Sequence, residues 1–255
     1  MSSQTIQQIL DDIALSLVFF TRLPLPTFDF RGRTLAEAIW AAPVAGLVVA
    51  ILGGVIYGLA TICGLAASPA AALALAAMTL ATGCLHEDGL SDVADGFGGG
   101  GTCEKKLEIM RDSRIGSYGA AALGLSLLVR WSALSEIGGP THVLCALIAG
   151  HMASRALAGA FMHLLPPARA DGLAANAGRV SARTAAAGAI LGAAALFALG
   201  SGAAIVCAIF LLAILFFGFR SLCLRQISGH TGDTVGALQQ FGEITVLLVA
   251  SVFLS

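Results

Sequence analysis

The chain has 255 residues, of which 57% are hydrophobic and 11% are charged. Soluble domains typically carry about a quarter charged residues, so this composition indicates an integral membrane protein. Fourteen Lys and Arg residues against fifteen Asp and Glu residues give a formal net charge of −1, which excludes the basic surface typical of nucleic-acid binding. The six cysteines lack C-x-x-C spacing, and we expect neither a zinc site nor a disulfide framework.

The N-terminal segment differs from a typical signal peptide. It has no basic region, and the apolar run that follows reaches only to Phe20, before Thr21, Arg22 and two prolines. We therefore expect that this segment is not cleaved, and that residues 1–255 form a single domain.

Long uncharged segments predict the membrane spans. Residues 38–85 contain no Asp, Glu, Lys or Arg over 48 positions, more than twice the roughly 20 that one helix needs to cross a bilayer. This run is expected to turn back between residues 64 and 69, and the uncharged run 184–219 to turn at residues 200–202. We predict an all-α integral membrane bundle of about six to seven transmembrane helices, with spans at 38–60, 68–85, 115–135 and 141–165, two in 184–219, and a last apolar run to Ser255.

The polar segments between these spans predict the orientation in the membrane. They fall on one side and comprise residues 1–37, 86–114, 166–183 and 220–243. Twelve of the fourteen Lys and Arg residues lie in them, whereas the opposite turns hold none. By the positive-inside rule that side is cytoplasmic. We expect a multi-pass protein of the cell (inner) membrane with an acidic cytoplasmic loop over 86–114.

Seven of the fifteen acidic residues fall within 86–114. Asp88, Asp92 and Asp95 follow i, i+4, i+7 spacing, so in a helix they lie within about 60° of one another on one face. Like charges at that spacing repel unless a cation lies between them, and carboxylate oxygens suit Mg²⁺ or Mn²⁺. Gly89 lowers the stability of a helix by about 1 kcal/mol relative to Ala, which indicates that something approaches the chain closely at this position.

A second group of charges follows a glycine run. Glu108 and Asp112 repeat the i, i+4 spacing, and Arg111 and Arg114 are interleaved with them. The glycines at 96–101 allow the chain to reverse, so that two short helices face each other, or allow backbone N–H groups to approach a phosphate.

Two simpler interpretations of 86–114 remain open at this point. The charges could only keep a solvated loop out of the bilayer, or Asp88 and Asp112 could cap helices. Spaced aspartates with nearby arginines are, however, typical of enzymes that transfer a phosphoryl-linked group from a nucleotide diphosphate to an alcohol. In such enzymes metal ions neutralise the pyrophosphate, and a carboxylate orients or deprotonates the attacking hydroxyl.

Arg155 lies fifteen residues into a predicted span. An unpaired arginine there costs at least about 2.5–3.5 kcal/mol, so we expect it to face the bundle interior, with Asp233 and Glu243 as candidate partners. Structural hydrogen bonding is expected of three histidines, namely His86, His151 and His163. Loop positions are expected for Arg169 and Asp171.

Four segments, in order and along the whole chain, resemble the cobalamin-5′-phosphate synthase family, also called adenosylcobinamide-GDP ribazoletransferase. They are FFTRLPLP at 19–26, HEDGLSDVADGFGGG at 86–100, EKKLEIMRDSRIGSYG at 104–119 and GHTGDTVGALQQFGE at 229–243. Two positions depart from the family pattern. His230 stands in place of an apolar or aromatic residue, and Gln240 in place of a common acid.

The resemblance implies a Mg²⁺-dependent transferase in a late step of cobalamin biosynthesis. The ribose hydroxyl of α-ribazole 5′-phosphate would attack the cobinamide-side phosphorus of adenosylcobinamide-GDP, forming adenosylcobalamin 5′-phosphate and GMP. The implied metal ligands are Asp88, Asp92, Asp95, Glu108 and Asp112, and the implied catalytic carboxylates are Asp88, Asp92 and Asp112. The candidate phosphate contacts are Arg22, Arg111 and Arg114, because a guanidinium fork matches phosphate oxygens, although Arg22 could instead be an anchor at the membrane interface. Arg155 and Asp233 are further candidate substrate contacts. Glu87 ranks lower, because the family varies at this position. The bilayer is the other expected partner, and a homo-oligomer remains open.

Two other functions compete with this one. A CDP-alcohol phosphotransferase would carry a D-G-x-x-A-R element, but Asp88-Gly89 is followed here by Leu-Ser-Asp-Val. In a corrinoid transporter, Arg155 and the acids at the ends of the spans could line a transport pathway. Broken helices in two matching halves of the chain would support this function. The sequence contains no such repeat.

Overall fold

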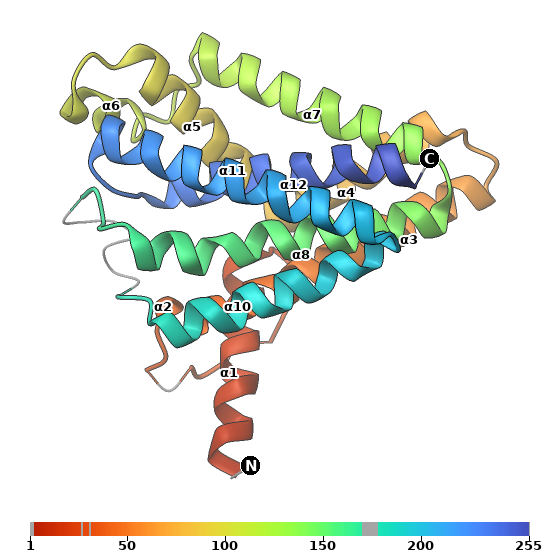
Figure 1. Cartoon of the computed structure of the whole chain (residues 1–255), viewed down its shortest axis with the longest axis horizontal. Coiled ribbons are helices and arrows are strands. Elements are labelled where there is room, and N and C mark those ends of the chain that lie inside the picture. Colours follow the sequence, from red (N-terminus) through yellow and green to blue (C-terminus); the bar gives the residue numbers. More distant parts are fainter. Residues whose placement is uncertain (1–2, 27, 31, 170–177, 255) are drawn as a thin grey trace.

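A computed structural model describes residues 3–26, 28–30, 32–169 and 178–254. These residues form helices and no β-strand, apart from an isolated bridge between Pro167 and His230 (Figure 1). The helices are α1 (Ser3–Phe20), α2 (Leu35–Ala38), η1 (Ile39–Ala41), α3 (Ala42–Ile62), α4 (Ala67–Thr82), α5 (Leu85–Gly99), α6 (Cys103–Ile109), α7 (Ser117–Ile137), α8 (Pro140–Leu164), α10 (Ala182–Ala195), η2 (Leu196–Leu199), α11 (Gly202–Ile227) and α12 (Gly232–Phe253).

The predicted polytopic α-helical bundle is confirmed. Six helical segments of the described chain are long and apolar enough to cross a membrane, and the bent pair α4 and α5 brings the number to seven if it counts as one span. The six are Leu35–Ile62, Ser117–Ile137, Pro140–Leu164, Ala182–Leu199, Gly202–Ile227 and Gly232–Phe253. Helix α1 stands away from the bundle at its N-terminal end (Figure 1).

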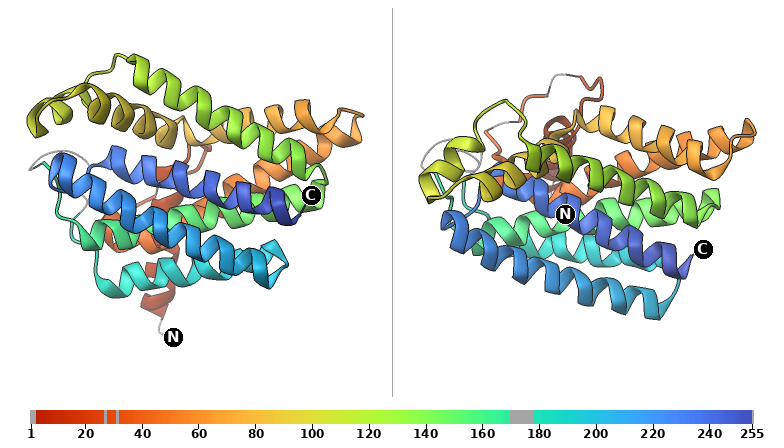
Figure 2. Two further views of the ribbon diagram at one scale, coloured as in Figure 1. Left: turned by 45° about the horizontal axis from the view of Figure 1, so that its top comes forward. Right: turned by 90° about the horizontal axis from the view of Figure 1, so that it is seen from above.

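The two ends of the bundle differ in polarity. Helix α6 lies at one end, and the C-terminus and the α7–α8 turn lie at the opposite end (Figure 2). The bridge between Pro167 and His230 joins the segments after α8 and after α11, and Arg169 donates a hydrogen bond to Leu107 O of α6 at 2.8 Å. The charged segments are therefore gathered at the α6 end. Arg31 and Asp171 lie outside the described residues.

The segment 220–243, expected as a polar connection between spans, is largely helical, and that part of the prediction is wrong. Helices α5 and α6 occupy most of 86–114, and α11 continues to Ile227 before α12 begins at Gly232. Glu87 of α5 and Gln240 and Glu243 of α12 are buried and hydrogen-bonded inside the bundle, so these parts of the polar segments belong to its interior. The expected reversal at the glycine run, with two short helices in contact, is confirmed.

Helix α5 begins inside the bundle because the chain bends sharply after α4. Gly83 and Cys84 both have left-handed backbone angles, with φ of +63° and +60°, and the axes of α4 and α5 differ by 88°. Glycine adopts this conformation freely, whereas Cys84 pays a cost of about 1–2 kcal/mol. The backbone N–H of Arg22 donates to Ala81 O at 2.6 Å beside the bend. The bend thus places the acidic helix along α7 and α12.

Candidate active site at the α6 end of the bundle

Close contact between α5 and α12 brings acidic residues of the two helices together. A Cβ on Gly89 would lie 2.7 Å from Asp233 O, and a Cβ on Gly236 would lie 3.4 Å from the Cα of His86. The close approach that Gly89 predicted is therefore confirmed, and the neighbour is α12. Asp92 interacts electrostatically with both Asp88 and Asp233 across this contact.

A cavity of about 490 Å³ opens beside α5, and we call it the acidic cavity. Most predicted charged site residues of 86–114 line it. Its polar lining comprises Thr79, Cys84, Glu87, Asp88, Ser91, Asp92, Arg111, Asp112, Ser113 and Arg114. Carboxylates and guanidinium groups that are far apart along the chain thus share one space. A guanidinium fork matches phosphate oxygens, so this lining suits a phosphorylated substrate.

Asp112 and Arg114 form an ion pair at the edge of the acidic cavity. Arg114 Nε donates to both carboxylate oxygens of Asp112, at 3.0 and 3.1 Å. These hydrogen bonds lower the pKa of Asp112 to about 2, and they raise the pKa of Arg114. A group with so low a pKa is poorly matched to general base catalysis near neutral pH. Asp112 is better suited to hold Arg114 or a cation.

Two predicted metal ligands lie apart from the acidic cavity's lining. Both oxygens of Asp95 accept backbone N–H groups of α7, from Gly116 at 2.7 Å and Gly119 at 2.8 Å. Asp95 thus satisfies the free donors at the start of α7. Glu108 is exposed on α6 and accepts from Lys105 Nζ at 2.9 Å.

Only some of the predicted substrate contacts line the acidic cavity. Arg111 and Arg114 line the acidic cavity, and Asp233 lines a neighbouring cavity described below. Arg22 is exposed and packs against Gly83 at the bend between α4 and α5. Arg155 lies in the bundle interior, as expected, with 2% of its surface exposed.

A buried ionic network lies beneath the acidic cavity. Arg130 of α7 donates to Glu87 Oε1 of α5 at 3.1 Å and to Glu243 Oε1 of α12 at 3.3 Å. Glu87 and Glu243 are 7% and 1% exposed, and Arg130 is 2% exposed. Charges so deeply buried are tolerated when they are paired and hydrogen-bonded. Three helices are therefore joined by one guanidinium group.

The network continues into α8. Arg155 Nη1 lies 2.8 Å from His151 Nδ1. His151 Nδ1 also lies 3.2 Å from Glu243 Oε2. Glu243 is therefore the nearby acid that interacts electrostatically with Arg155, and no ion pair joins Arg155 to Asp233 among the described residues. Two glutamates and two arginines balance the formal charge of the network.

Two adjacent glutamines of α12 extend the network, in which Glu87 Oε2, Arg130 Nε and Arg155 Nε have no hydrogen-bond partner among the described residues. Gln239 Nε2 donates to Glu243 Oε2 at 2.7 Å, and Gln240 Nε2 donates to Glu87 Oε1 at 3.3 Å. Gln240 departs from the family pattern, yet it has a defined bond here. Glu243 was predicted as a candidate partner of Arg155, whereas the parts played by Glu87 and Arg130 were not predicted, although Arg130 within a predicted span was a signal for them.

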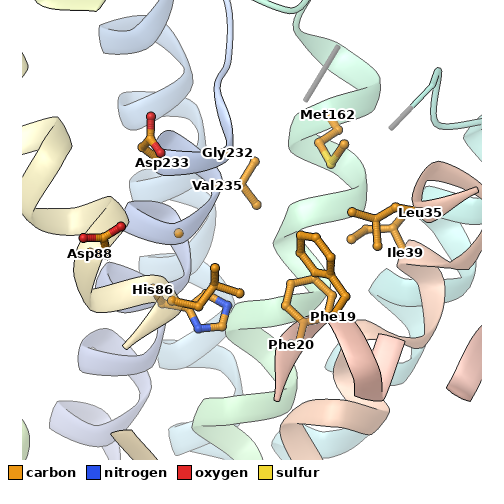
Figure 3. A pocket seen from close by; sticks show the side chains of 12 residues that line it. Phe19, Phe20, Leu35, Ile39, His86, Asp88, Met162, Gly232, Asp233 and Val235 are labelled. Atoms are coloured by element: carbon orange, nitrogen blue, oxygen red, sulfur yellow. The ribbon is translucent and has the colours of Figure 1, made fainter. Parts of the chain in front are cut away.

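A second cavity, of about 170 Å³, lies on the other side of Asp88, and we call it the aromatic cavity (Figure 3). Asp88 lines both cavities. The aromatic cavity is lined by Phe19, Phe20, Leu35, Ile39, Leu85, His86, Asp88, Met162, Gly232, Asp233, Val235 and Gly236. The sequence analysis assigned no role to its apolar residues.

The arrangement of the carboxylates limits how a metal ion could be bound. Within the described ranges, no three His, Cys, Asp or Glu side chains are grouped closely enough to hold an ion by themselves. Mg²⁺ is usually bound by one or two carboxylates together with waters and substrate phosphates. Asp88, Asp92 and Asp112, which line one cavity, fit that second type of site.

These features define a multi-pass α-helical membrane protein with a site of carboxylates and arginines at one end of its bundle. Comparisons with known proteins agree across the whole chain. The family model for cobalamin-5-phosphate synthase matches residues 12–251. The chain belongs to this family.

Two relatives are named adenosylcobinamide-GDP ribazoletransferase. The protein from Mesorhizobium japonicum is 67% identical over 249 residues, covering 98% of this chain and 96% of the relative. The protein from Bradyrhizobium diazoefficiens is 48% identical over 256 residues, covering 98% and 97%. No solved structure matches the chain.

Proposed function

We propose that this protein is an adenosylcobinamide-GDP ribazoletransferase, the activity for which its relatives are named. The reaction joins adenosylcobinamide-GDP to α-ribazole 5′-phosphate and yields adenosylcobalamin 5′-phosphate and GMP. One observation carries the proposal beyond the family match: Asp88, Asp92 and Asp112 line a single cavity with Arg111 and Arg114. That combination suits the transfer of a phosphorus-linked group.

The three carboxylates of the acidic cavity have different proposed roles in the reaction. Asp88 is exposed and lines both cavities, so it is our candidate for the general base. It accepts the proton of the attacking ribose hydroxyl as the new O–P bond forms and the bond to GMP breaks. Asp92, one helical turn further along, faces the same space. Asp112 holds Arg114, so this guanidinium is oriented before substrate arrives.

The arginines of the acidic cavity are proposed to bind the pyrophosphate of adenosylcobinamide-GDP. Arg111 and Arg114 line the acidic cavity and provide donors for phosphate oxygens. Their charge stabilises the GMP leaving group as its phosphate gains negative charge. Arg169, which is anchored on Leu107 O and interacts with Asp92 and Asp233, moderates the repulsion among the carboxylates.

Mg²⁺ is our proposed cofactor. Asp88, Asp92 and Asp112 are the residues that would hold it together with the pyrophosphate of the substrate. When bound, it would neutralise the pyrophosphate and lower the barrier to departure of GMP. Asp95 and Glu108 are weaker candidates, because each already has the protein partners described above.

The membrane orientation forms part of the proposal. The α6 end holds the charged segments, and the positive-inside rule places such segments in the cytoplasm. We propose that the protein resides in the inner membrane and that the acidic cavity opens toward the cytoplasm, where both substrates dissolve.

The proposal is tested by measuring GMP release from adenosylcobinamide-GDP by the detergent-purified protein. Mg²⁺ and α-ribazole 5′-phosphate are each included or omitted. Release that requires both supports the transferase and its metal. Release without the ribazole indicates a hydrolase, and corrinoid uptake into liposomes without GMP release indicates a transporter.

A further inference from the structure

The aromatic cavity has a composition that the phosphate chemistry of the acidic cavity does not explain. The rings of Phe20 and His86 are stacked, with centroids 5.8 Å apart and planes 8° apart. Phe19 packs edge-on against Phe20 at 4.9 Å. Together they form an aromatic wall at one end of a mainly apolar cavity. Such walls bind planar rings through offset stacking and edge contacts.

The cavity is polar on one side only. Figure 3 shows Asp88 and Asp233 on one side, and Leu35, Ile39 and Met162 on the other. A ligand that fits has an apolar planar part and a polar part that reaches the carboxylates. Hydroxyl groups of a sugar would donate to those carboxylates.

His86 supplies one further polar group. It is 4% exposed, and neither of its ring nitrogens takes part in a hydrogen bond among the described residues. Its ring nitrogens do not belong to the fully enclosed, unpaired polar atoms of the described residues, so they are open to the cavity. The ring lines the cavity, so a single hydrogen bond from a ligand would satisfy it.

The size of the cavity restricts its occupant. Complete drug-sized ligands fill pockets of roughly 300–1,000 Å³, whereas this cavity measures about 170 Å³. A corrin macrocycle is far too large, and one bicyclic ring is of the right order. Guanine is bicyclic but carries several donors and acceptors on its edges, which the Leu, Ile, Met and Val side chains here would leave unpaired.

We propose that the aromatic cavity binds the aromatic base of the acceptor nucleoside, the benzimidazole-type ring of α-ribazole 5′-phosphate. This assignment rests on the proposed function. The base carries one free ring nitrogen, which accepts a hydrogen bond from His86, and it is otherwise apolar. Its ribose then lies at Asp88, where the two cavities meet, and the ribose hydroxyl faces the pyrophosphate in the acidic cavity. Asp233 contacts the ribose from the α12 side.

The test uses two variants that alter the cavity in different ways. Val235→Phe fills it, and His86→Phe keeps an aromatic ring but removes the hydrogen-bonding nitrogens. Val252→Phe is the matched control, because Val252 lies on the same helix and is 73% exposed near its other end. Thermal unfolding in detergent establishes whether each variant is folded. If Val235→Phe is not folded, His86→Phe alone is used for the test.

Binding is measured by equilibrium dialysis with two probes, α-ribazole 5′-phosphate and ribose 5-phosphate, which lacks the base. We expect the wild type to bind the first at least about tenfold more tightly than the second. Val235→Phe and His86→Phe should lose most of this difference, and Val252→Phe should keep it. In turnover assays the KM for α-ribazole 5′-phosphate should rise about tenfold, with the KM for adenosylcobinamide-GDP changed less than twofold.

Other outcomes have defined meanings. A raised KM for adenosylcobinamide-GDP alone would place guanine in the cavity and overturn the assignment. Unchanged affinities in both variants, with GMP still released, would overturn it and leave the proposed function intact. The expected binding pattern without any GMP release would support the cavity assignment as a nucleoside site and overturn the proposed transfer.

Discussion

Glu87 and Asp88 are adjacent in the sequence but belong to different environments. Glu87 is buried, borders only the acidic cavity, and its Oε1 accepts hydrogen bonds from Arg130 and Gln240, whereas Asp88 is exposed and lines both cavities. Consecutive residues of a helix point about 100° apart, which allows one turn to serve both places. Substitution of the two residues should therefore affect different properties.

Asp88→Asn should remove activity without unfolding the protein. General base catalysis typically contributes 10²–10⁴-fold, so we expect kcat for GMP release to fall by at least about a hundredfold. The midpoint of thermal unfolding should change little, because Asp88 is exposed. Glu104→Gln, on the exposed face of α6, is the control and should retain activity. Normal turnover in Asp88→Asn would remove this residue from the site.

Arg130→Gln should destabilise the bundle. It leaves Glu87 and Glu243 buried without their cation, and breaking a buried ion pair in this way costs about 3–5 kcal/mol. The double variant Arg130→Gln/Glu87→Gln removes one charge of each sign, and it should recover part of the loss. Lys105→Gln breaks an exposed pair and should cost at most about 1 kcal/mol. Denaturant titration in detergent micelles measures all three, and equal loss in the single and double variants would contradict the charge-balance argument.

Gly89→Ala should disturb the contact between α5 and α12. The added Cβ would lie 2.7 Å from Asp233 O, a backbone atom that cannot rotate away. We expect a loss of about 1–3 kcal/mol in stability from overpacking, together with reduced activity as Asp233 is displaced. Gly218→Ala, at a helix position with no atom within 4 Å of the new Cβ, should be neutral or slightly stabilising. A fully active, stable Gly89→Ala protein would show that α12 can shift freely.

Asp95→Asn separates a structural role from metal binding. The amide can accept from only one of Gly116 and Gly119, and its NH₂ group faces the other N–H. We expect a stability loss of about 1–3 kcal/mol. The Mg²⁺ concentration that gives half-maximal GMP release should stay within twofold of the wild-type value. A large increase in that concentration would instead support Asp95 as a metal ligand.

Asp112→Asn tests the ion pair with Arg114. Because the pKa of Asp112 is held at about 2, its carboxylate is charged throughout the range above roughly pH 4. Protonation of Asp112 therefore does not produce the acidic limb of a pH–rate profile measured from pH 5 upward. We expect lower kcat/KM in Asp112→Asn with the apparent pKa of that limb unchanged. A shifted limb would show that Asp112 titrates in the active range.

The sequence allowed correct prediction of most of the architecture, because spans and turns follow from local composition. The uncharged runs identified the spans, and Gly89 indicated a close helix contact. Arg155 was correctly predicted to face the bundle interior, because an unpaired arginine within a span is energetically costly. Asp88, Asp92 and Asp112 were also grouped, and they share one cavity.

The parts that were wrong or missed depend on contacts between distant segments. Gln239, Gln240 and Glu243 resemble a loop in the sequence, and they are helical because Glu87 and Arg130 complete their hydrogen bonds. The aromatic cavity combines the end of α1 with the starts of α5 and α12, and no spacing rule connects these segments.

The buried ionic network has a consequence for the order of biosynthesis. Translation delivers Glu87 first, then Arg130 and Arg155, and Glu243 only with the final helix. Until α12 emerges from the translocon, the nascent bundle carries one uncompensated positive charge in its interior. The last helix therefore brings the formal charge of the buried network to zero.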